Sequence, residues 1–139
     1  MPSASSFERE VRFAVVIYGG VSLAIYINGV AQEMLRLVRS TAVDPATGEF
    51  LYPEPVGSAR VYRKLASIAG DGKLHVAGTT TDADGMPIVE ADGRRRTQFV
   101  IDILSGTSAG GINAVFLAKA LSNNQSLDQL AQMWIDEAD

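Results

Sequence analysis

The chain has no cysteine and a single histidine, His75. Without cysteine it can form no disulfide, no thiol nucleophile and no Cys-ligated metal site. One histidine leaves little room for a histidine-rich metal site or a Ser-His-Asp triad. Basic residues are fewer than acidic ones: the chain has 12 Lys and Arg and 16 Asp and Glu, and its net charge is −4. This balance argues against a nucleic-acid partner, and nothing in the composition calls for a metal or a cofactor.

Apolar residues are plentiful enough for one globular domain. The 139 residues are 47% hydrophobic and 20% charged, which is typical of a folded chain and not of a disordered one. A chain of this length usually forms one domain and can bury a sizeable core.

A run without charged side chains extends from residue 13 to residue 31. Its length would suit a membrane helix or the apolar part of a signal peptide. Gly19-Gly20 interrupts the run, however, and polar residues follow. We therefore favour a buried strand over residues 11–18, a glycine turn, and a helix over residues 21–39. The apolar stripe of that helix is Ile27, Ala31, Met34 and Val38.

A second strand–turn–helix unit follows near the end of the chain. Residues 98–104 predict a buried strand, residues 105–111 a tight turn and residues 112–121 an apolar helix. A capping box at Ser126-x-x-Gln129 starts a last helix. Two such units predict an α/β fold with a parallel sheet. Both turns then lie at the carboxyl edge of the strands, where folds of this class bind their ligands.

The sequence thus divides into an opening unit at 11–40, a turn-rich excursion at 41–97 and a closing unit at 98–138. Prolines and Asp-Gly pairs mark the excursion as a stretch of turns outside the core. The elements expected within it are a short helix at 60–69, with Val61, Leu65 and Ile68 on one side, and hairpin strands at 73–81 and 87–90. Residues 1–9 are expected to fray.

The second turn contains the pattern Gly106-x-Ser108-x-Gly110. In a nucleophile elbow a serine occupies a sharp, strained turn between a strand and a helix, so that its hydroxyl is exposed. Small residues at 106 and 110 let the strand and the helix pass closely. The helix N-terminus below the serine favours negative charge on the reacting oxygen. The alternative is an ordinary strand-to-helix turn in which Ser108 caps the helix.

Gly19-Gly20 supplies another glycine turn at a helix start. Backbone amides at Gly19, Gly20 and Val21 could form an oxyanion hole or bind a phosphate. The sequence contains neither G-x-G-x-x-G nor a G-K-[ST] ending, which makes nucleotide binding the weaker alternative. A turn that needs glycine only for its backbone angles is the plain alternative. The pairing of this turn with the Ser108 turn is what favours acyl-transfer chemistry.

A serine nucleophile needs a base, and the sequence offers no strong candidate. His75 precedes Ser108 and falls in the excursion, where a surface position is expected. Asp102 is expected inside the strand as a buried polar group, set back from the edge. The acids after Ser108 belong to the last helix or follow it, and are expected to be solvated.

These two turns resemble those of a known family. Residues 105–111, Ser-Gly-Thr-Ser-Ala-Gly-Gly, resemble the nucleophile elbow of patatin-like phospholipases, and residues 15–24 resemble their oxyanion loop. The order and spacing suit the bacterial patatin-related group, and the resemblance covers residues 11–40 and 98–138. The loop of that family is usually Asp-Gly-Gly-Gly-x-Arg-Gly. The residues standing here for its Asp, first Gly, Arg and last Gly are Ile17, Tyr18, Ser22 and Leu23.

The resemblance implies a three-layer α/β/α parallel sheet, of which this chain would be an N-terminal portion. It also implies a Ser–Asp dyad without a catalytic histidine. Ser108 would be the nucleophile, and residues 19–21 would form the oxyanion hole. The dyad Asp lies well downstream of the serine in that family, so it is expected beyond this chain. The full-length protein would then be a lipid acyl hydrolase of phospholipase A type, and this chain alone would be inactive.

The expected substrate is a lipid or another acyl ester, handled by a cytoplasmic protein with peripheral contact to a membrane. Tyr26 and Phe116 are candidates for contact with an acyl chain, although core packing is the expected use of both. The basic run at 94–96 could contact anionic headgroups, while a solvated hairpin edge is the commoner use of such a run. An acyltransferase and a non-catalytic interaction module are the alternative functions.

Overall fold

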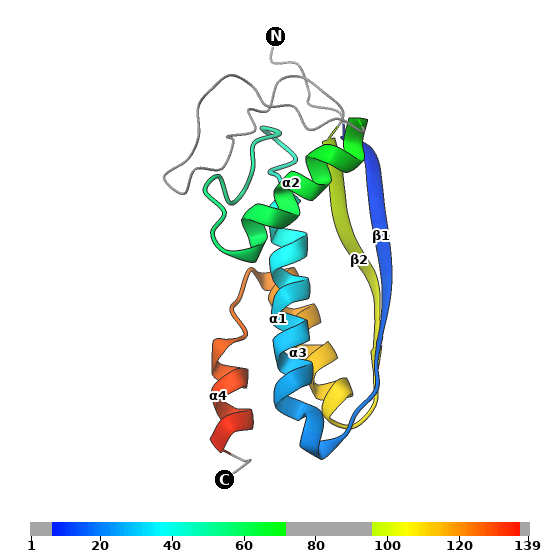
Figure 1. Cartoon of the computed structure of the whole chain (residues 1–139), viewed down its shortest axis with the longest axis vertical. Helices are drawn as coiled ribbons and strands as arrows, with labels where there is room; N and C mark the ends of the chain where they lie inside the picture. The colour runs from blue at the N-terminus through cyan, green and yellow to red at the C-terminus, as the bar shows by residue number, and fades with distance from the viewer. Residues whose placement is uncertain (1–6, 72–95, 137–139) are drawn as a thin grey trace. The chain divides into compact units, whose positions relative to one another are not determined.

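The computed structural model describes residues 7–71 and 96–136 (Figure 1). The described residues form two compact units: unit 1 holds 7–11, 37–71 and 96–100, and unit 2 holds 12–36 and 101–136. The elements in chain order are β1 (Phe7–Ile17), the 3₁₀ turn η1 (Val21–Leu23), α1 (Ala24–Thr41), α2 (Ser58–Asp71), β2 (Arg96–Gly106), α3 (Ala109–Asn123) and α4 (Asp128–Asp136). The hairpin strands expected at 73–81 and 87–90, His75, and Arg94 and Arg95 lie outside the described residues.

Strands β1 and β2 are hydrogen-bonded neighbours in a parallel pair, and each is followed by a glycine turn and a helix. The predicted α/β class is therefore confirmed, and residues 13–31 form strand, turn and helix rather than one membrane helix. Strand β1 already begins at Phe7, so the expectation that residues 7–9 fray is wrong. In unit 1 the Arg9 guanidinium donates to the carbonyl oxygen of Ala69 at 3.0 Å, which helps to hold this end of the strand.

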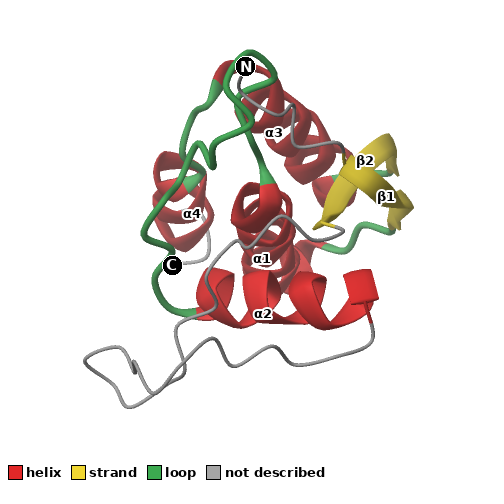
Figure 2. Ribbon diagram, turned by 90° about the horizontal axis from the view of Figure 1, so that it is seen from above, coloured by secondary structure: helices red, strands yellow, loops and turns green. Residues whose placement is uncertain are grey.

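Helices α1, α3 and α4 of unit 2 all lie on the same side of the two strands (Figures 1 and 2). The predicted stripe on α1 contributes Ile27 and Ala31 to the core, and Leu35, which the stripe omits, is buried as well. The buried apolar residues of the two core clusters are Val15, Ile17, Ile27, Ala31, Leu35, Ala114, Leu117, Ala120, Leu127 and Leu130. Burial of each of the larger side chains contributes about 1.5–3 kcal/mol, and this packing holds α1 and α3 against the strands.

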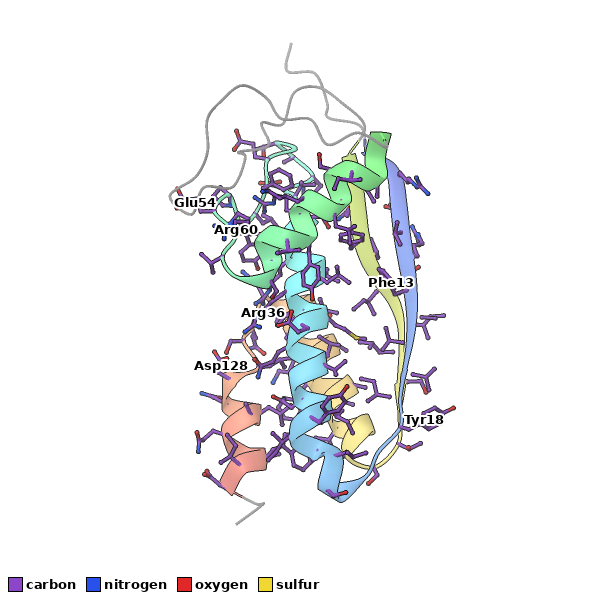
Figure 3. All side chains as sticks on the ribbon, in the orientation of Figure 1. Phe13, Tyr18, Arg36, Glu54, Arg60 and Asp128 are labelled. Atoms are coloured by element: carbon purple, nitrogen blue, oxygen red, sulfur yellow. The ribbon has the colours of Figure 1, made fainter. Side chains whose placement is uncertain are left out.

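The other face of the strands is uncovered among the described residues. Val16 is 56% exposed, Tyr18 is 78% exposed and points away from the helices (Figure 3), and Ile103 is 59% exposed. Asp102 also lies on the exposed side, where its Oδ2 pairs with Nη1 of Arg12 at 3.0 Å. The expectation that Asp102 is buried is therefore wrong, because its carboxylate lies at the surface beside Arg12 and no helix among the described residues covers it.

Unit 1 is held together by Arg63 of α2. Its guanidinium donates to three backbone carbonyl oxygens, those of Ser40, Tyr52 and Pro53, and its Cζ lies 3.9 Å from the ring centroid of Phe50. These contacts tie α2 to the end of α1 and to the loop between the two helices. The helix predicted at 60–69 is confirmed as part of α2. Val61, Leu65 and Ile68 on its apolar side are exposed, however, and Ala66 is buried.

Candidate nucleophile elbow

Ser108 sits in the sharp turn between β2 and α3. Its backbone angles are φ 53° and ψ −131°, a combination that side-chain-bearing residues rarely adopt and that costs about 1–3 kcal/mol. Backbone hydrogen bonds on both sides hold the turn: Thr107 N donates to Ile17 O at 3.2 Å, and Ile112 N donates to Ser108 O at 3.1 Å. The strain is thus imposed by the end of β1 and the first turn of α3.

Ser108 does not act as a helix cap. It occupies the N-cap position of α3 but makes no side-chain capping hydrogen bond, and capping residues normally have β-region backbone angles. Ser126 supplies the contrast, because its Oγ accepts a hydrogen bond from the amide of Asp128 at the start of α4. The capping interpretation of Ser108 is therefore wrong, and the Ser108 side chain is exposed.

Gly106 and Gly110 let strand and helix approach each other, as their small size predicts. A Cβ atom added to Gly106 would lie 2.6 Å from the carbonyl oxygen of Gly110. One added to Gly110 would lie 2.2 Å from the carbonyl oxygen of Ile17, at the end of β1. A side chain at either position would force the backbone apart, so both glycines are required by space.

Gly19 brings the first glycine turn against the second. A Cβ atom on Gly19 would lie 2.2 Å from Thr107 O and 2.6 Å from the Cβ of Ser108. The amide of Gly19 donates to Oγ1 of Thr107 at 3.3 Å. At Gly20 an added Cβ would meet only Leu23, at 3.7 Å or more, so this position has room for a side chain. The two turns are therefore in direct contact, and Gly19 makes the contact.

Two helix starts meet at this corner of unit 2. Leu23 N donates to Gly20 O, which closes the first turn of η1. The amides of Gly20 and Val21 precede that bond and so have no acceptor within the turn. In α3 the first helical hydrogen bonds are donated by Gly111 and Ile112. The amide of Ala109 precedes them and likewise has no acceptor within the helix. The sequence-based site did not include Ala109, although the residue after an elbow serine often supplies an oxyanion donor.

Apolar side chains around the elbow are exposed. Tyr26 is 71% exposed and Phe116 is 42% exposed, so the expectation that both pack in the core is wrong. Ile112 and Val115, on the first turns of α3, are exposed as well. Phe116 also lines a cavity of about 350 Å³ at the far end of α3, together with Lys119, Ala120, Gln125, Ser126, Gln129 and Leu130.

No base contacts Ser108 among the described residues. Asp102 is paired with Arg12, and the acids of α4 make local contacts: Asp128 accepts from the Ser126 hydroxyl, and Asp136 accepts from Gln132. The described residues also contain no cluster of three or more histidine or acidic side chains that could hold a metal ion. The chemistry available in this part of the chain is that of a strained hydroxyl and backbone donors.

The sequence analysis missed a buried amide pair below the two turns. Asn28 of α1 and Asn113 of α3 are 2% and 0% exposed, and Nδ2 of Asn28 donates to Oδ1 of Asn113 at 3.1 Å. Each asparagine lies one helical turn after its helix begins. That repeated position after a glycine turn, in an otherwise apolar stretch, is the pattern that could have identified the pair.

Comparison with known proteins gives a relative that has no assigned activity. No family model matches the chain, and no solved structure matches it. It is 31% identical over 137 residues to the uncharacterized membrane protein Rv3479 of Mycobacterium tuberculosis. The alignment covers 95% of this chain and 10% of that protein, so the chain spans about a tenth of the length of the relative it matches.

The relative is named a membrane protein, and a helix that spans a bilayer must be long and apolar. No helix in the described part of the chain combines the length and the apolar character needed to span one. Since the relative is uncharacterized, the chemistry of this chain has to be inferred from the geometry around Ser108.

Proposed function

We propose that this chain carries the nucleophile and oxyanion loop of a lipid acyl hydrolase, a phospholipase A-like serine esterase similar to the patatin-like phospholipases. The observation that carries the proposal is the state of Ser108: strained, exposed, without a capping bond, and in contact with a second glycine turn. A turn whose serine served only to start a helix would adopt β-region angles and bond the helix amides. In the proposal the full-length protein completes the three-layer sheet of that family.

In the proposed reaction Oγ of Ser108 attacks the carbonyl carbon of an acyl ester and forms a C–O bond. The amides of Gly20 and Val21, with that of Ala109, donate to the oxyanion, while Gly19 sets the distance between the turns. The serine proton passes to a carboxylate elsewhere in the full-length protein and then to the leaving alcohol. Water hydrolyses the acyl-enzyme, which releases the acid and restores the serine. Loss of one such donor typically lowers the rate about 100- to 1000-fold.

The exposed apolar side chains near the elbow support an acyl-chain substrate. Tyr26 and Ile112, on the first turns of α1 and α3, present apolar area to solvent, and Val115 and Phe116 do so further along α3. Exposed apolar groups of this kind commonly mark sites that bind apolar ligands or membrane surfaces. The proposal therefore includes peripheral contact with a lipid surface, in a cytoplasmic protein.

Ester hydrolysis by the protein at its full natural length tests the proposal. The substrates are p-nitrophenyl butyrate and a fluorogenic phospholipid, and the variants are Ser108→Ala and the matched control Ser105→Ala, whose serine is an exposed residue of β2. We expect turnover by the wild type and by Ser105→Ala, and none by Ser108→Ala. Turnover that survives Ser108→Ala, or an inactive wild type, would contradict the proposal. A product acylated on an added alcohol instead of water would favour the acyltransferase.

A further inference from the structure

A chain of side-chain amides runs between α1 and α3 in unit 2. Gln32 Nε2 donates to Asn28 Oδ1 at 2.9 Å, and Asn28 Nδ2 donates to Asn113 Oδ1 at 3.1 Å. Asn113 Nδ2 then donates to the carbonyl oxygen of Ala109 at 2.9 Å. The last acceptor belongs to the residue that follows Ser108, so the amide chain ends at the backbone of the elbow.

The direction of this chain is fixed by its end. The carbonyl oxygen of Ala109 can only accept, so the Asn113 side chain must present its NH₂ group there and its oxygen to Asn28. Asn28 in turn must present its NH₂ group to Asn113. A rotation of either amide by half a turn would set two oxygens or two NH₂ groups against each other. The pair is therefore a directional link with a single satisfied arrangement.

The surroundings of the pair make the link strong. Ala24 and Ala109 lie one helical turn before the two asparagines, Ala114 follows Asn113 in the chain, and all three are buried. A hydrogen bond is electrostatically stronger there than in water, and a buried amide left without a partner costs about 1–3 kcal/mol. Apolar side chains at these two positions would avoid the cost of burying amides. A hydrogen-bonded amide pair, in contrast, fixes the geometry of the contact between the helices.

We propose that Asn28 and Asn113 are positioning residues, which set the separation of the oxyanion loop from Ser108. Helix α1 follows the glycine turn and η1 directly, and helix α3 follows Ser108 directly. Asn28 and Asn113 each lie one turn into their helix. A bond between them fixes the two helix starts against each other, and the two loops extend from those starts. This inference rests on the proposed function for its kinetic consequence. Its structural consequence, the ordering of the loop amides, does not depend on catalysis.

The test replaces both amides by leucines of similar size. The double variant Asn28→Leu/Asn113→Leu leaves no unpaired amide in the link except that of Gln32, so it is expected to fold. Asn28→Asp is the second variant, because it keeps the shape and, when the carboxyl group is ionised, replaces the donor by a charged acceptor. The matched control is Leu130→Ala, which removes buried side-chain volume on α4 without touching either turn. All variants are made in the protein at its full natural length.

Kinetics and hydrogen exchange give separate readouts. We expect kcat for p-nitrophenyl butyrate to fall about 10- to 100-fold in the double variant and in Asn28→Asp, with KM nearly unchanged, because a small misplacement of reacting groups is costly. Leu130→Ala is expected to lower the unfolding temperature and to leave kcat within about twofold of the wild type. We also expect faster exchange, in the two asparagine variants only, at three hydrogen-bonded amides of the two turns, those of Leu23, Gly111 and Ile112.

The two proposals fail in different ways. If Ser108→Ala is inactive and the double variant keeps the wild-type kcat, the positioning role is overturned and the hydrolase stands. If the wild type is inactive, the hydrolase fails, and hydrogen exchange decides the positioning role. Unchanged exchange at the amides of Leu23, Gly111 and Ile112 in both asparagine variants would then overturn it, and faster exchange there, absent from Leu130→Ala, would support it.

Discussion

A Cβ atom on Gly19 would lie 2.6 Å from the Cβ of Ser108, closer than two unbonded side-chain carbons can stand. The glycine of one turn and the serine of the other therefore touch, although most of the chain separates them in sequence. This contact makes the two turns a single site in unit 2, and it can be tested directly with side chains of graded size.

Gly19→Ala is predicted to destabilise the protein, and Gly20→Ala is not. The added methyl group at 19 would overlap Thr107 O at 2.2 Å, whereas the nearest atom at 20 is 3.7 Å away. Overpacking of this kind costs about 1–3 kcal/mol. Urea unfolding of the two variants measures the difference. Equal stability of the two would mean that the turns do not touch in solution.

Ser108→Gly is predicted to be more stable than Ser108→Ala by about 1–2 kcal/mol, because glycine adopts φ 53° without steric cost. The same comparison at Ser105, in the strand, should have the opposite sign, since glycine weakens regular structure by about 0.5–1 kcal/mol relative to alanine. Thermal unfolding of the four variants provides the measurement. A lower stability of Ser108→Gly than of Ser108→Ala would show that the strained turn is not populated.

Arg63→Met is predicted to destabilise unit 1 by about 2–3 kcal/mol. The change removes the donors to Ser40, Tyr52 and Pro53 and leaves three carbonyl oxygens without them. The control is Arg36→Met, which loses an exposed contact with Glu33 and should change stability by less than about 0.5 kcal/mol. Hydrogen exchange of the α2 amides, compared between the variants, locates the effect. Similar protection of α2 in both would argue against the role of Arg63.

Asn28→Asp is predicted to make stability fall as the pH rises. Burial, and the Oδ1 of Asn113 facing the new carboxyl group, disfavour its charged form, so its pKa rises above the unfolded value of about 3.9. A raised folded pKa contributes stability that is present below the unfolded pKa and is lost as the pH rises through the folded pKa. The difference in unfolding free energy from the wild type should therefore be larger at pH 7 than at pH 4. A pH-independent difference would mean that the side chain at 28 faces water.

The sequence was sufficient for the parts of the fold that follow from local pattern. Runs of β-branched residues ended by glycines predict β1 and β2, and the spacing of Ile27 and Ala31 predicts the buried side of α1. The sharp turn at Ser108 follows from small residues at fixed offsets between a strand and a helix.

Other features depend on contacts that no local pattern contains. The exposure of Asp102 and Tyr26 depends on which sides of the elements are covered, and the described residues cover only one side of the strands. The contact of Gly19 with Ser108 depends on the pairing of strands that lie far apart in sequence. Asn28 and Asn113 are polar residues on apolar helix faces, and only their meeting across two helices explains them.

Labelling with a fluorophosphonate probe shows whether Ser108 is a nucleophile, because such probes form a covalent bond with an activated serine. The protein at its full natural length would be labelled, digested and mapped by mass spectrometry, beside Ser108→Ala and Ser105→Ala. We expect one adduct, on Ser108, in the wild type and in Ser105→Ala, and none in Ser108→Ala. A folded wild-type protein that stays unlabelled, or an adduct on another serine that persists in Ser108→Ala, would contradict the proposed role of Ser108.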